Sequence, residues 1–231
     1  MSSTADPAQT LASPGHDQTQ APTSSTTAAT ASTAPHDASG GQPAAAAAAA
    51  AELASTKIKL LGALKTFPDF PIPGISFIDI LPLFQDPVIH LALLRALELQ
   101  VLESGVKPDV IVGLDARGFL FGPSLALRLN ASFVPVRKRG KLPGPCVTAS
   151  FEKEYGTDYF QMQVGAIERG QNVLVVDDII ATGGSAAAAG TLVKELRGNL
   201  VGYLFILEIP FLHGRNKLDG VSTTTLLETD G

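Results

Sequence analysis

Residues 173–185 read Val-Leu-Val-Val-Asp-Asp-Ile-Ile-Ala-Thr-Gly-Gly-Ser, and this stretch is the most informative in the chain. The four apolar residues at its start predict a strand that is buried on both faces of a parallel sheet. Two acids follow at the carboxyl end of that strand, and then a turn of small residues opens a helix predicted over 185–196. A strand that runs through a short turn into a helix is the building unit of α/β proteins.

The neighbouring segments continue this alternation of strands and helices. Asp86 and Pro87 supply an N-cap and a first-turn proline, so we predict a helix over 88–103. A second helix is predicted over 118–129, and strands over 109–114, 133–136 and 200–207. These segments form consecutive strand-helix-strand units with right-handed crossovers. The expected fold class is therefore α/β, with a mostly parallel central sheet flanked by helices.

The turn after the strand at 173–176 has the properties of an anion site. Backbone N–H groups at a helix start, the helix dipole and glycines that admit a close approach together favour a phosphate group, and Thr182 and Ser185 add hydroxyl donors. Asp177 and Asp178 can accept hydrogen bonds from sugar hydroxyls or lie near Mg²⁺. The simpler alternatives are an ordinary Gly-Gly turn and an aspartate that only caps a helix. The pattern is neither a P-loop nor a dinucleotide-binding fingerprint.

The same stretch resembles the signature of type I phosphoribosyltransferases that binds 5-phosphoribosyl 1-pyrophosphate (PRPP). The likeness covers the four apolar residues, the two acids, two further apolar residues and Ala-Thr-Gly-Gly-Ser. It implies that the chain has the fold of that family, including a small hood subdomain, and that it binds PRPP. The PRPP-binding residues implied in this stretch are Asp177, Asp178, Ala181, Thr182, Gly183, Gly184 and Ser185.

Residues 67–80, Phe-Pro-Asp-Phe-Pro-Ile-Pro-Gly-Ile-Ser-Phe-Ile-Asp-Ile, resemble the hood of adenine phosphoribosyltransferases in particular. The resemblance puts Phe77 against the adenine ring and the backbone around Ser76 and Ile78 at its edge, where donors and acceptors distinguish an amine from a carbonyl. Many members of the family carry Arg where this chain has Ile78. The alternative is that Phe77 is an ordinary core residue. Ile179 and Ile209 complete the adenine-binding set that the resemblance implies.

Residues 113–123, Gly-Leu-Asp-Ala-Arg-Gly-Phe-Leu-Phe-Gly-Pro, are similar to the family's pyrophosphate loop. Arg117 would hold pyrophosphate oxygens through charge-assisted hydrogen bonds. In this fold the turn from Asp115 to Arg117 can contain a strained or cis peptide bond. The alternative is that Asp115 and Arg117 form an ordinary surface ion pair.

Residues 136–145 and 150–156 resemble the basic segment and the mobile catalytic loop of the adenine enzymes. The resemblance implies that Arg137 and Lys141 contact PRPP, whereas Lys138 and Arg139 face solvent or a second subunit. A run of cations is usually only a solvated patch, but in an acidic chain these can focus positive potential on a pyrophosphate. Glu154 is the implied catalytic residue, which handles a proton near the purine imidazole ring.

The implied reaction couples adenine to PRPP and yields AMP and pyrophosphate, with Mg²⁺ carried by PRPP and a homodimer as the expected assembly. Two rivals stay open. A 6-oxopurine phosphoribosyltransferase shares the PRPP loop but needs a different base pocket. A PRPP-sensing regulator can retain the fold without turnover, although such a protein usually brings a DNA-binding or other partner domain.

Composition sets the remaining expectations. The net charge of −5 and the pI near 5.3 argue against a broad surface for nucleic acid or anionic membrane.

Residues 1–51 form a low-complexity extension that we expect to be disordered, and residues 52–231 form the phosphoribosyltransferase domain with its hood around 67–80. A helix is expected to begin near Glu52, and the alanine run 44–51 can extend it. Neither a targeting sequence nor an apolar span is visible, and the single cysteine, Cys146, suits a reducing cytosol.

Overall fold

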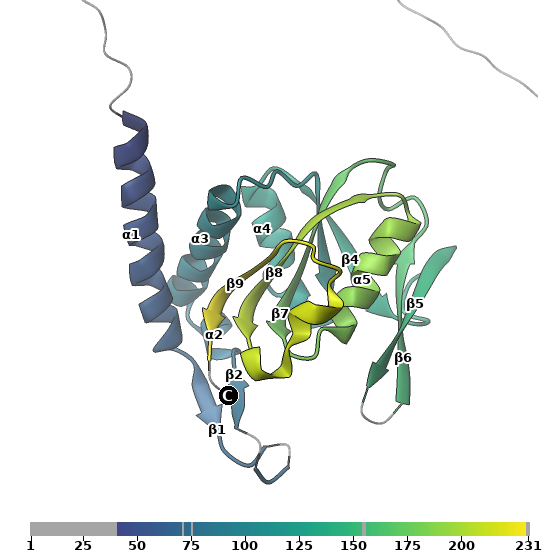
Figure 1. Cartoon of the computed structure of the whole chain (residues 1–231), viewed down its shortest axis with the longest axis horizontal. Helices are drawn as coiled ribbons and strands as arrows, with labels where there is room; N and C mark the ends of the chain where they lie inside the picture. Colours follow the sequence, from purple (N-terminus) through teal and green to yellow (C-terminus); the bar gives the residue numbers. More distant parts are fainter. Residues whose placement is uncertain (1–40, 71, 75, 154–155, 230–231) are drawn as a thin grey trace, which may run out of the picture. The chain divides into compact units, whose positions relative to one another are not determined.

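A seven-stranded sheet forms the centre of the fold (Figure 1). The computed structural model describes residues 41–70, 72–74, 76–153 and 156–229. The strand order is β5-β6-β4-β3-β7-β8-β9, in which β3, β4, β7, β8 and β9 run parallel and the β5–β6 hairpin joins β4 in antiparallel fashion. The strands are β3 (Val110–Leu114), β4 (Ser132–Lys138), β5 (Cys146–Lys153), β6 (Gly156–Gln163), β7 (Asn172–Ile180), β8 (Asn199–Glu208) and β9 (Thr223–Glu228).

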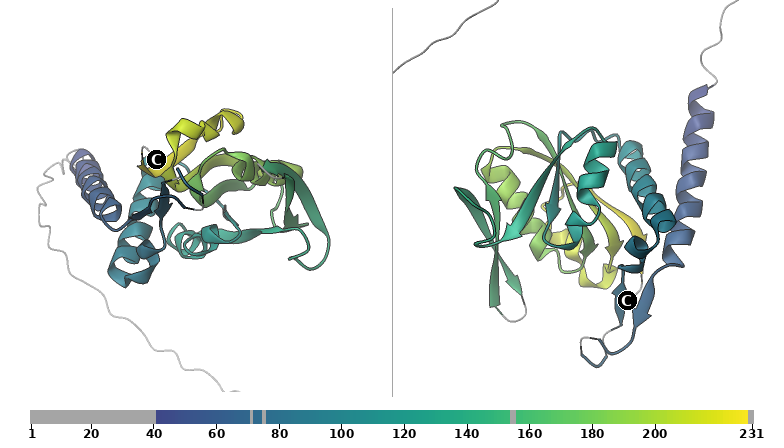
Figure 2. Two further views of the ribbon diagram at one scale, coloured as in Figure 1. Left: turned by 90° about the horizontal axis from the view of Figure 1, so that it is seen from below. Right: turned by 180° about the vertical axis from the view of Figure 1, so that it is seen from behind.

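Helices cover both faces of this sheet, as Figure 2 shows. Because successive side chains of a strand point to opposite faces, β7 contributes to both cores. Val173 and Val175 pack in the cluster that contains α5, whereas Leu174 and Val176 pack in the cluster that contains α1, α3 and α4. The helices are α1 (Gly41–Leu61), α2 (Pro82–Gln85), α3 (Pro87–Glu103), α4 (Gly122–Arg128) and α5 (Gly184–Glu195). The predicted α/β class and mostly parallel sheet are confirmed.

The start of α3 follows directly from its sequence. Pro87 occupies the first turn, and the Asp86 carboxylate accepts hydrogen bonds from the backbone N–H groups of Val88 at 2.7 Å and Ile89 at 3.3 Å. These bonds satisfy donors that have no partner within the helix. The predicted N-cap is confirmed.

A separate two-stranded hairpin lies beside the carboxyl ends of the sheet strands (Figure 1). Strand β1 (Lys65–Phe67) pairs in antiparallel register with β2 (Phe77–Asp79), so that Phe67 lies opposite Phe77. The hairpin lies in the region, around residues 67–80, where the sequence predicts a hood, and we refer to it as the hood.

Several boundaries differ from the expectation. Helix α1 begins at Gly41, because the alanine run favours helix, so the residues from 41 onward that we assigned to a disordered extension are helical. The helix predicted over 118–129 is divided into a 3-10 turn (Arg117–Phe119) and α4, which has a proline in its first turn. Residues 150–153 lie in strand β5 rather than in a loop.

The strand order creates a crevice at one position in the sheet. The chain passes from β3 to β4 in one direction, whereas β7, β8 and β9 follow one another in the other direction. In parallel α/β sheets, ligands bind at such a reversal, outside the carboxyl ends of the strands. The segments that follow β3 and β7 therefore meet where a ligand is expected. In the part of the chain that the structure describes, no helix combines the length and apolar character needed to cross a bilayer.

Candidate active site

The residues after β3 and β7 meet in an ion pair. Arg117 Nε lies 2.5 Å from Asp178 Oδ2, and this Asp178 oxygen has no hydrogen-bond partner among the described residues, so the contact is electrostatic. The peptide bond between Asp115 and Ala116 is cis. Asp115 pairs with Arg137 at 3.1 Å. The Asp115–Arg117 surface pair considered as an alternative is therefore absent, because each residue pairs with a partner on another strand.

A cavity of about 580 Å³ gathers the predicted cations. Arg137 donates from Nη1 to the Lys141 carbonyl oxygen at 3.3 Å, which fixes the turn after β4. Cationic side chains together with the carboxylates of Asp115, Asp177 and Asp178 suit a ligand that carries both an anion and hydroxyl groups. The lining residues are Asp115, Ala116, Arg117, Arg137, Lys138, Lys141, Phe151, Phe160, Asp177, Asp178 and Ser185.

Lys138 and Arg139 take different positions. Lys138 lines this cavity, its Nζ lies 3.8 Å from Asp158 Oδ2, and its side chain is 55% exposed, so it faces both the cavity and solvent. Arg139 lies over the Tyr159 ring, with its guanidinium carbon 5.5 Å from the ring centroid. Cation–π stacking of this kind accounts for Arg139 without a ligand.

The two acids at the end of β7 are held in a largely protein environment. Asp178 is 2% exposed, and Asp177 is partly exposed to the cavity. Burial raises the pKa of Asp177 well above its usual value, and the neighbouring Asp178 carboxylate adds to the rise. Burial also raises the pKa of Asp178, although Arg117 opposes the shift. Ligand groups that donate hydrogen bonds to these carboxylates, such as hydroxyl groups, are therefore favoured at this position.

The phosphate loop joins β7 to α5 and lines a second cavity of about 290 Å³. Gly183 has φ +79°, which a glycine adopts freely, and no side chain caps the first turn of α5. Residues 183–186 line the cavity, so this uncapped helix start and the positive end of the helix dipole lie beside it. The lining residues are Arg117, Asp177, Asp178, Ile179, Ile180, Ala181, Thr182, Gly183, Gly184, Ser185, Ala186, Phe205 and Ile209.

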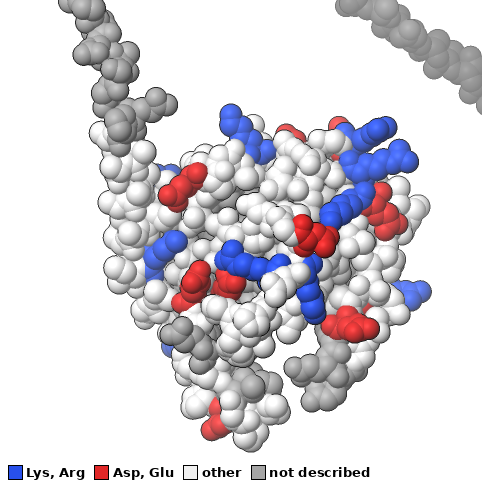
Figure 3. Space-filling model, viewed as in Figure 1, with Lys and Arg blue, Asp and Glu red and all other residues white. Residues whose placement is uncertain are grey.

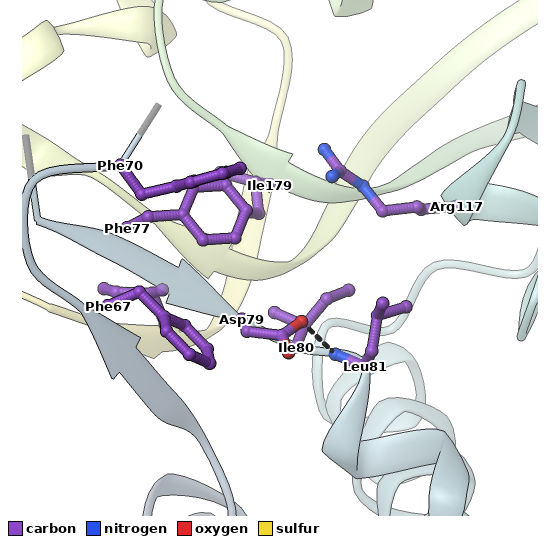
Figure 4. Close-up of a pocket in the computed structure, with 9 residues that line it drawn as sticks. Phe67, Phe70, Phe77, Asp79, Ile80, Leu81, Arg117 and Ile179 are labelled. Atoms are coloured by element: carbon purple, nitrogen blue, oxygen red, sulfur yellow. Dashed lines mark hydrogen bonds between the residues drawn. The ribbon is translucent and has the colours of Figure 1, made fainter. Parts of the chain in front are cut away.

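The hood encloses a third, mainly apolar cavity of about 360 Å³ (Figure 4). Phe70 and Phe77 meet edge to face, with ring centroids 5.1 Å apart at an interplanar angle of 72°. Phe67, Ile78 and Ile179 also line the cavity, together with Asp79, Ile80, Leu81 and Arg117. Aromatic and aliphatic walls with few polar groups suit a flat heterocycle.

The three cavities adjoin through shared residues. Arg117 lines all three, and Ile179 lines both the hood cavity and the phosphate-loop cavity. Two predicted adenine-binding residues lie elsewhere: Ile209 lines the phosphate-loop cavity, and Ser76 is exposed immediately before β2. Glu154 lies outside the described residues.

The sequence analysis missed two aromatic residues that line the cavity containing Arg117, Arg137, Lys138 and Lys141, which we call the cation cavity. Phe151 on β5 and Phe160 on β6 have ring centroids 4.6 Å apart. Apolar residues alternate along both strands, with Val147, Ala149 and Phe151 on β5 and Phe160 and Met162 on β6. A two-residue period of this kind predicts a half-buried hairpin.

The charge distribution on the face seen in Figure 3 also bears on the ligand. Acidic and basic side chains are interspersed over this face and do not form one broad basic surface. Four cationic side chains, those of Arg117, Arg137, Lys138 and Lys141, instead line one cavity together with three aspartates. This arrangement favours a small anionic ligand.

Comparison with known proteins identifies relatives of the chain. A family described as a phosphoribosyl transferase domain matches residues 88–208. The adenine phosphoribosyltransferase of Debaryomyces hansenii is 55% identical over 175 residues, which cover 76% of this chain and 93% of that protein. Adenine phosphoribosyltransferase 1 of Saccharomyces cerevisiae is 54% identical over 176 residues, covering 75% and 94%.

Solved structures agree with these relatives. A crystal structure of the Saccharomyces cerevisiae adenine phosphoribosyltransferase, in complex with an imino-altritol bisphosphate and adenine, superposes with a TM-score of 0.73. It is 55% identical and covers 75% of this chain and 99% of that chain. An enzyme from Rhodothermus marinus superposes with a TM-score of 0.70 at 42% identity, covering 76% and 99%. The chain thus belongs to the adenine phosphoribosyltransferase family.

Proposed function

We propose that the protein transfers the 5-phosphoribosyl group of PRPP to N9 of adenine, which produces AMP and pyrophosphate. The observation that carries this proposal is the position of Arg117, which lines the hood cavity, the cation cavity and the phosphate-loop cavity. A base, a pyrophosphate and a sugar phosphate bound in these cavities would meet beside one side chain. Alignment of two substrates in this way lowers the barrier by removing the entropy of their encounter.

The phosphate loop and the acid pair would hold the sugar. The 5-phosphate accepts hydrogen bonds from the backbone and hydroxyl groups of residues 181–185. Asp177 and Asp178 accept hydrogen bonds from the ribose hydroxyls, which keeps the anomeric carbon between the hood and the cations. Because burial disfavours their ionised forms, both carboxylates gain from such donors.

Charge neutralisation would drive departure of the pyrophosphate. The bond from the anomeric carbon to the pyrophosphate oxygen breaks with its electron pair, while the bond to N9 of adenine forms. Arg117, Arg137 and Lys141 stabilise the negative charge that develops on the leaving group. The proton on the base passes to Glu154, a role that the family resemblance supports.

Base selectivity would come from the hood. Phe77 packs on the purine face, and Ile179 lines the same cavity beside it. Backbone groups around Ser76 and Ile78 read the edge of the base, where adenine has an amine and a 6-oxopurine has a carbonyl. Ile78 contributes apolar contact in place of the Arg that many family members carry.

Mg²⁺ is the proposed cofactor, and it would enter with PRPP. Within the described ranges, no three His, Cys, Asp or Glu side chains form a group that could hold a metal ion unaided. This arrangement fits an ion that is held mainly by pyrophosphate oxygens, next to the acids of the cation cavity. When bound, it adds positive charge at the leaving group.

We also propose a cytosolic homodimer. Large apolar side chains lie exposed on α3 at Val88, Leu91 and Leu102 and on α4 at Leu127. Exposed apolar side chains on adjacent helices support burial against a second copy. Light scattering on the full chain would give twice the 24.0 kDa chain mass if this holds.

Adenine-dependent release of pyrophosphate from PRPP tests the proposed activity. The full chain should release pyrophosphate and form AMP in equal amounts when PRPP, Mg²⁺ and adenine are all present. A PRPP-sensing regulator would bind PRPP and release none. That outcome would refute the enzymatic proposal.

A further inference from the structure

The segment that follows β8 packs directly against the phosphate loop, residues 181–185. A Cβ atom placed on Gly183 would lie 2.2 Å from the Gly214 carbonyl oxygen. In the reverse direction, a Cβ atom on Gly214 would lie 2.3 Å from the Ala181 carbonyl oxygen and 3.0 Å from the Gly183 nitrogen. Real Cβ atoms do not occupy such positions, so the two backbones pack directly against each other. Gly214 therefore limits the position of residues 181–183.

An ion-pair network between the half-exposed Arg215 and the buried Glu208 carboxylate fixes Gly214 in turn. The next residue, Arg215, donates from Nε to both oxygens of Glu208, at 2.8 and 3.0 Å, and from Nη2 to Glu208 Oε2. It also donates from Nη1 to the Thr223 carbonyl oxygen at 2.8 Å and from Nη2 to Thr225 Oγ1 at 3.0 Å. These bonds tie the segment after β8 to the end of β8 and to β9. The planar guanidinium fork makes the tie directional.

The acid in this network is structural rather than available to a ligand. Glu208 is a buried carboxylate, and the hydrogen bond from Arg215 holds the pKa of Glu208 below its usual value. Thr225 Oγ1 donates to the same carboxylate at 3.1 Å. Within the described part of the chain, Glu208, Gly214 and Arg215 do not line the three cavities of the site. They can therefore affect a ligand only through the loop they support.

We propose that Gly214, held by the Glu208–Arg215 ion pair, is a positioning residue that sets the shape of the phosphate loop for the 5-phosphate of PRPP. The inference rests on the proposed function for the identity of its ligand. Its physical basis is that the loop binds through backbone N–H groups, whose directions depend on the backbone alone. A displacement of a few tenths of an ångström at residues 181–183 misaligns several such donors together.

Gly214→Ala tests this proposal against Gly220→Ala. Both glycines lie between β8 and β9, and Gly220 has φ +70° with no atom within 4 Å of its Cβ position. The control therefore strains the backbone without moving the phosphate loop. We expect Gly214→Ala to raise the KM for PRPP about tenfold or more, as expected for loss of a hydrogen bond to a charged group. The KM for adenine and the PRPP kinetics of Gly220→Ala should stay within about twofold of the parent values.

Calorimetry with ribose 5-phosphate separates this inference from the proposed function, because binding needs no turnover. The Kd of Gly214→Ala should rise in parallel with its KM for PRPP. If the parent protein binds ribose 5-phosphate but forms no AMP, the proposed function fails and the loop comparison can still be made. Equal effects of Gly214→Ala and Gly220→Ala on the KM for PRPP would overturn the inference.

If Gly214→Ala does not fold, Arg215→Lys supplies the same test. Lysine keeps the positive charge but loses the forked geometry, so the KM for PRPP should rise severalfold. Thr225→Ser, which keeps the hydroxyl, should retain the parental KM for PRPP. A lower melting temperature of Arg215→Lys with unchanged PRPP and ribose 5-phosphate binding would assign the ion pair to stability alone.

Discussion

Arg117 and Asp178 come from opposite sides of the strand reversal and meet at 2.5 Å, although the arginine side chain is 47% exposed and the aspartate 3%. Strands β3 and β7 are parallel neighbours, with Gly113 opposite Val176. The segments that leave these strands must therefore lie side by side. The proposed leaving-group cation and the proposed sugar acid are adjacent because of the sheet topology.

Replacing Asp177 and Asp178 should weaken PRPP binding without destabilising the fold. Asp177→Asn with Asp178→Asn is expected to raise the KM for PRPP by about 10²-fold, because two acceptors for sugar hydroxyls are weakened. Adenine affinity should be little changed. Steady-state kinetics with each substrate varied in turn measure both effects, and unaltered PRPP kinetics would exclude the pair from the site.

The pH dependence of stability provides an independent check on these acids. Since the pKa of each is raised in the folded state, their favourable contribution exists below the unfolded pKa, near 4, and is lost as the pH rises through the raised folded value. The double Asn variant should therefore melt at or above the parent temperature at pH 7.5, and its advantage should shrink toward pH 4. A variant that melts several degrees below the parent at pH 7.5 would contradict this assignment.

Removal of the Phe77 ring from the hood should weaken the binding of adenine but not that of PRPP. Phe77→Ala is expected to raise the KM for adenine by about tenfold or more, because a purine loses an aromatic face, while the KM for PRPP stays near the parental value. Phe211, which is 61% exposed, offers a matched Phe→Ala control outside the hood cavity. Equal losses for adenine and PRPP would show that Phe77 supports the fold rather than the base.

Glu154→Gln tests the proposed proton transfer. The amide keeps the size of the side chain but cannot accept the proton, so single-turnover AMP formation should slow by about 10²-fold or more. PRPP affinity should be preserved. Glu152→Gln, at an exposed position two residues earlier on β5, is the control. A Glu154→Gln rate within a few fold of the parent would leave catalysis to alignment and charge neutralisation.

We expect residues 1–40 to be dispensable for activity and stability, whereas helix α1 is needed for stability. Deletion of residues 1–40 is expected to leave turnover and melting temperature nearly unchanged, because the described core begins with the helix. Leu60→Ala should destabilise the protein by about 2–5 kcal/mol, since Leu60 is 0% exposed within that core. AMP formation and thermal unfolding measure the effect of the deletion, and urea unfolding measures the change in stability of Leu60→Ala. A large loss on deletion would show that the extension contributes to the folded domain.

The sequence predicted the central elements because their signals are local. Asp86 and Pro87 mark the start of α3, and the apolar run at 173–176 marks a buried strand. The pairing of Arg137 with Asp115 and the packing of Gly214 behind Gly183 could not be predicted, because both depend on which strands become neighbours. The β5–β6 hairpin was detectable from its alternation, but the resemblance to a loop concealed it.

Base competition is the most direct test of the central claim. The full chain is supplied with PRPP, Mg²⁺ and an equimolar mixture of adenine, hypoxanthine and guanine, and the nucleotides formed are separated and quantified. The account predicts AMP as the dominant product, because the hood reads the amine edge of the purine and excludes the oxo bases by leaving buried polar groups unpaired. Formation of IMP or GMP at a comparable rate would contradict it.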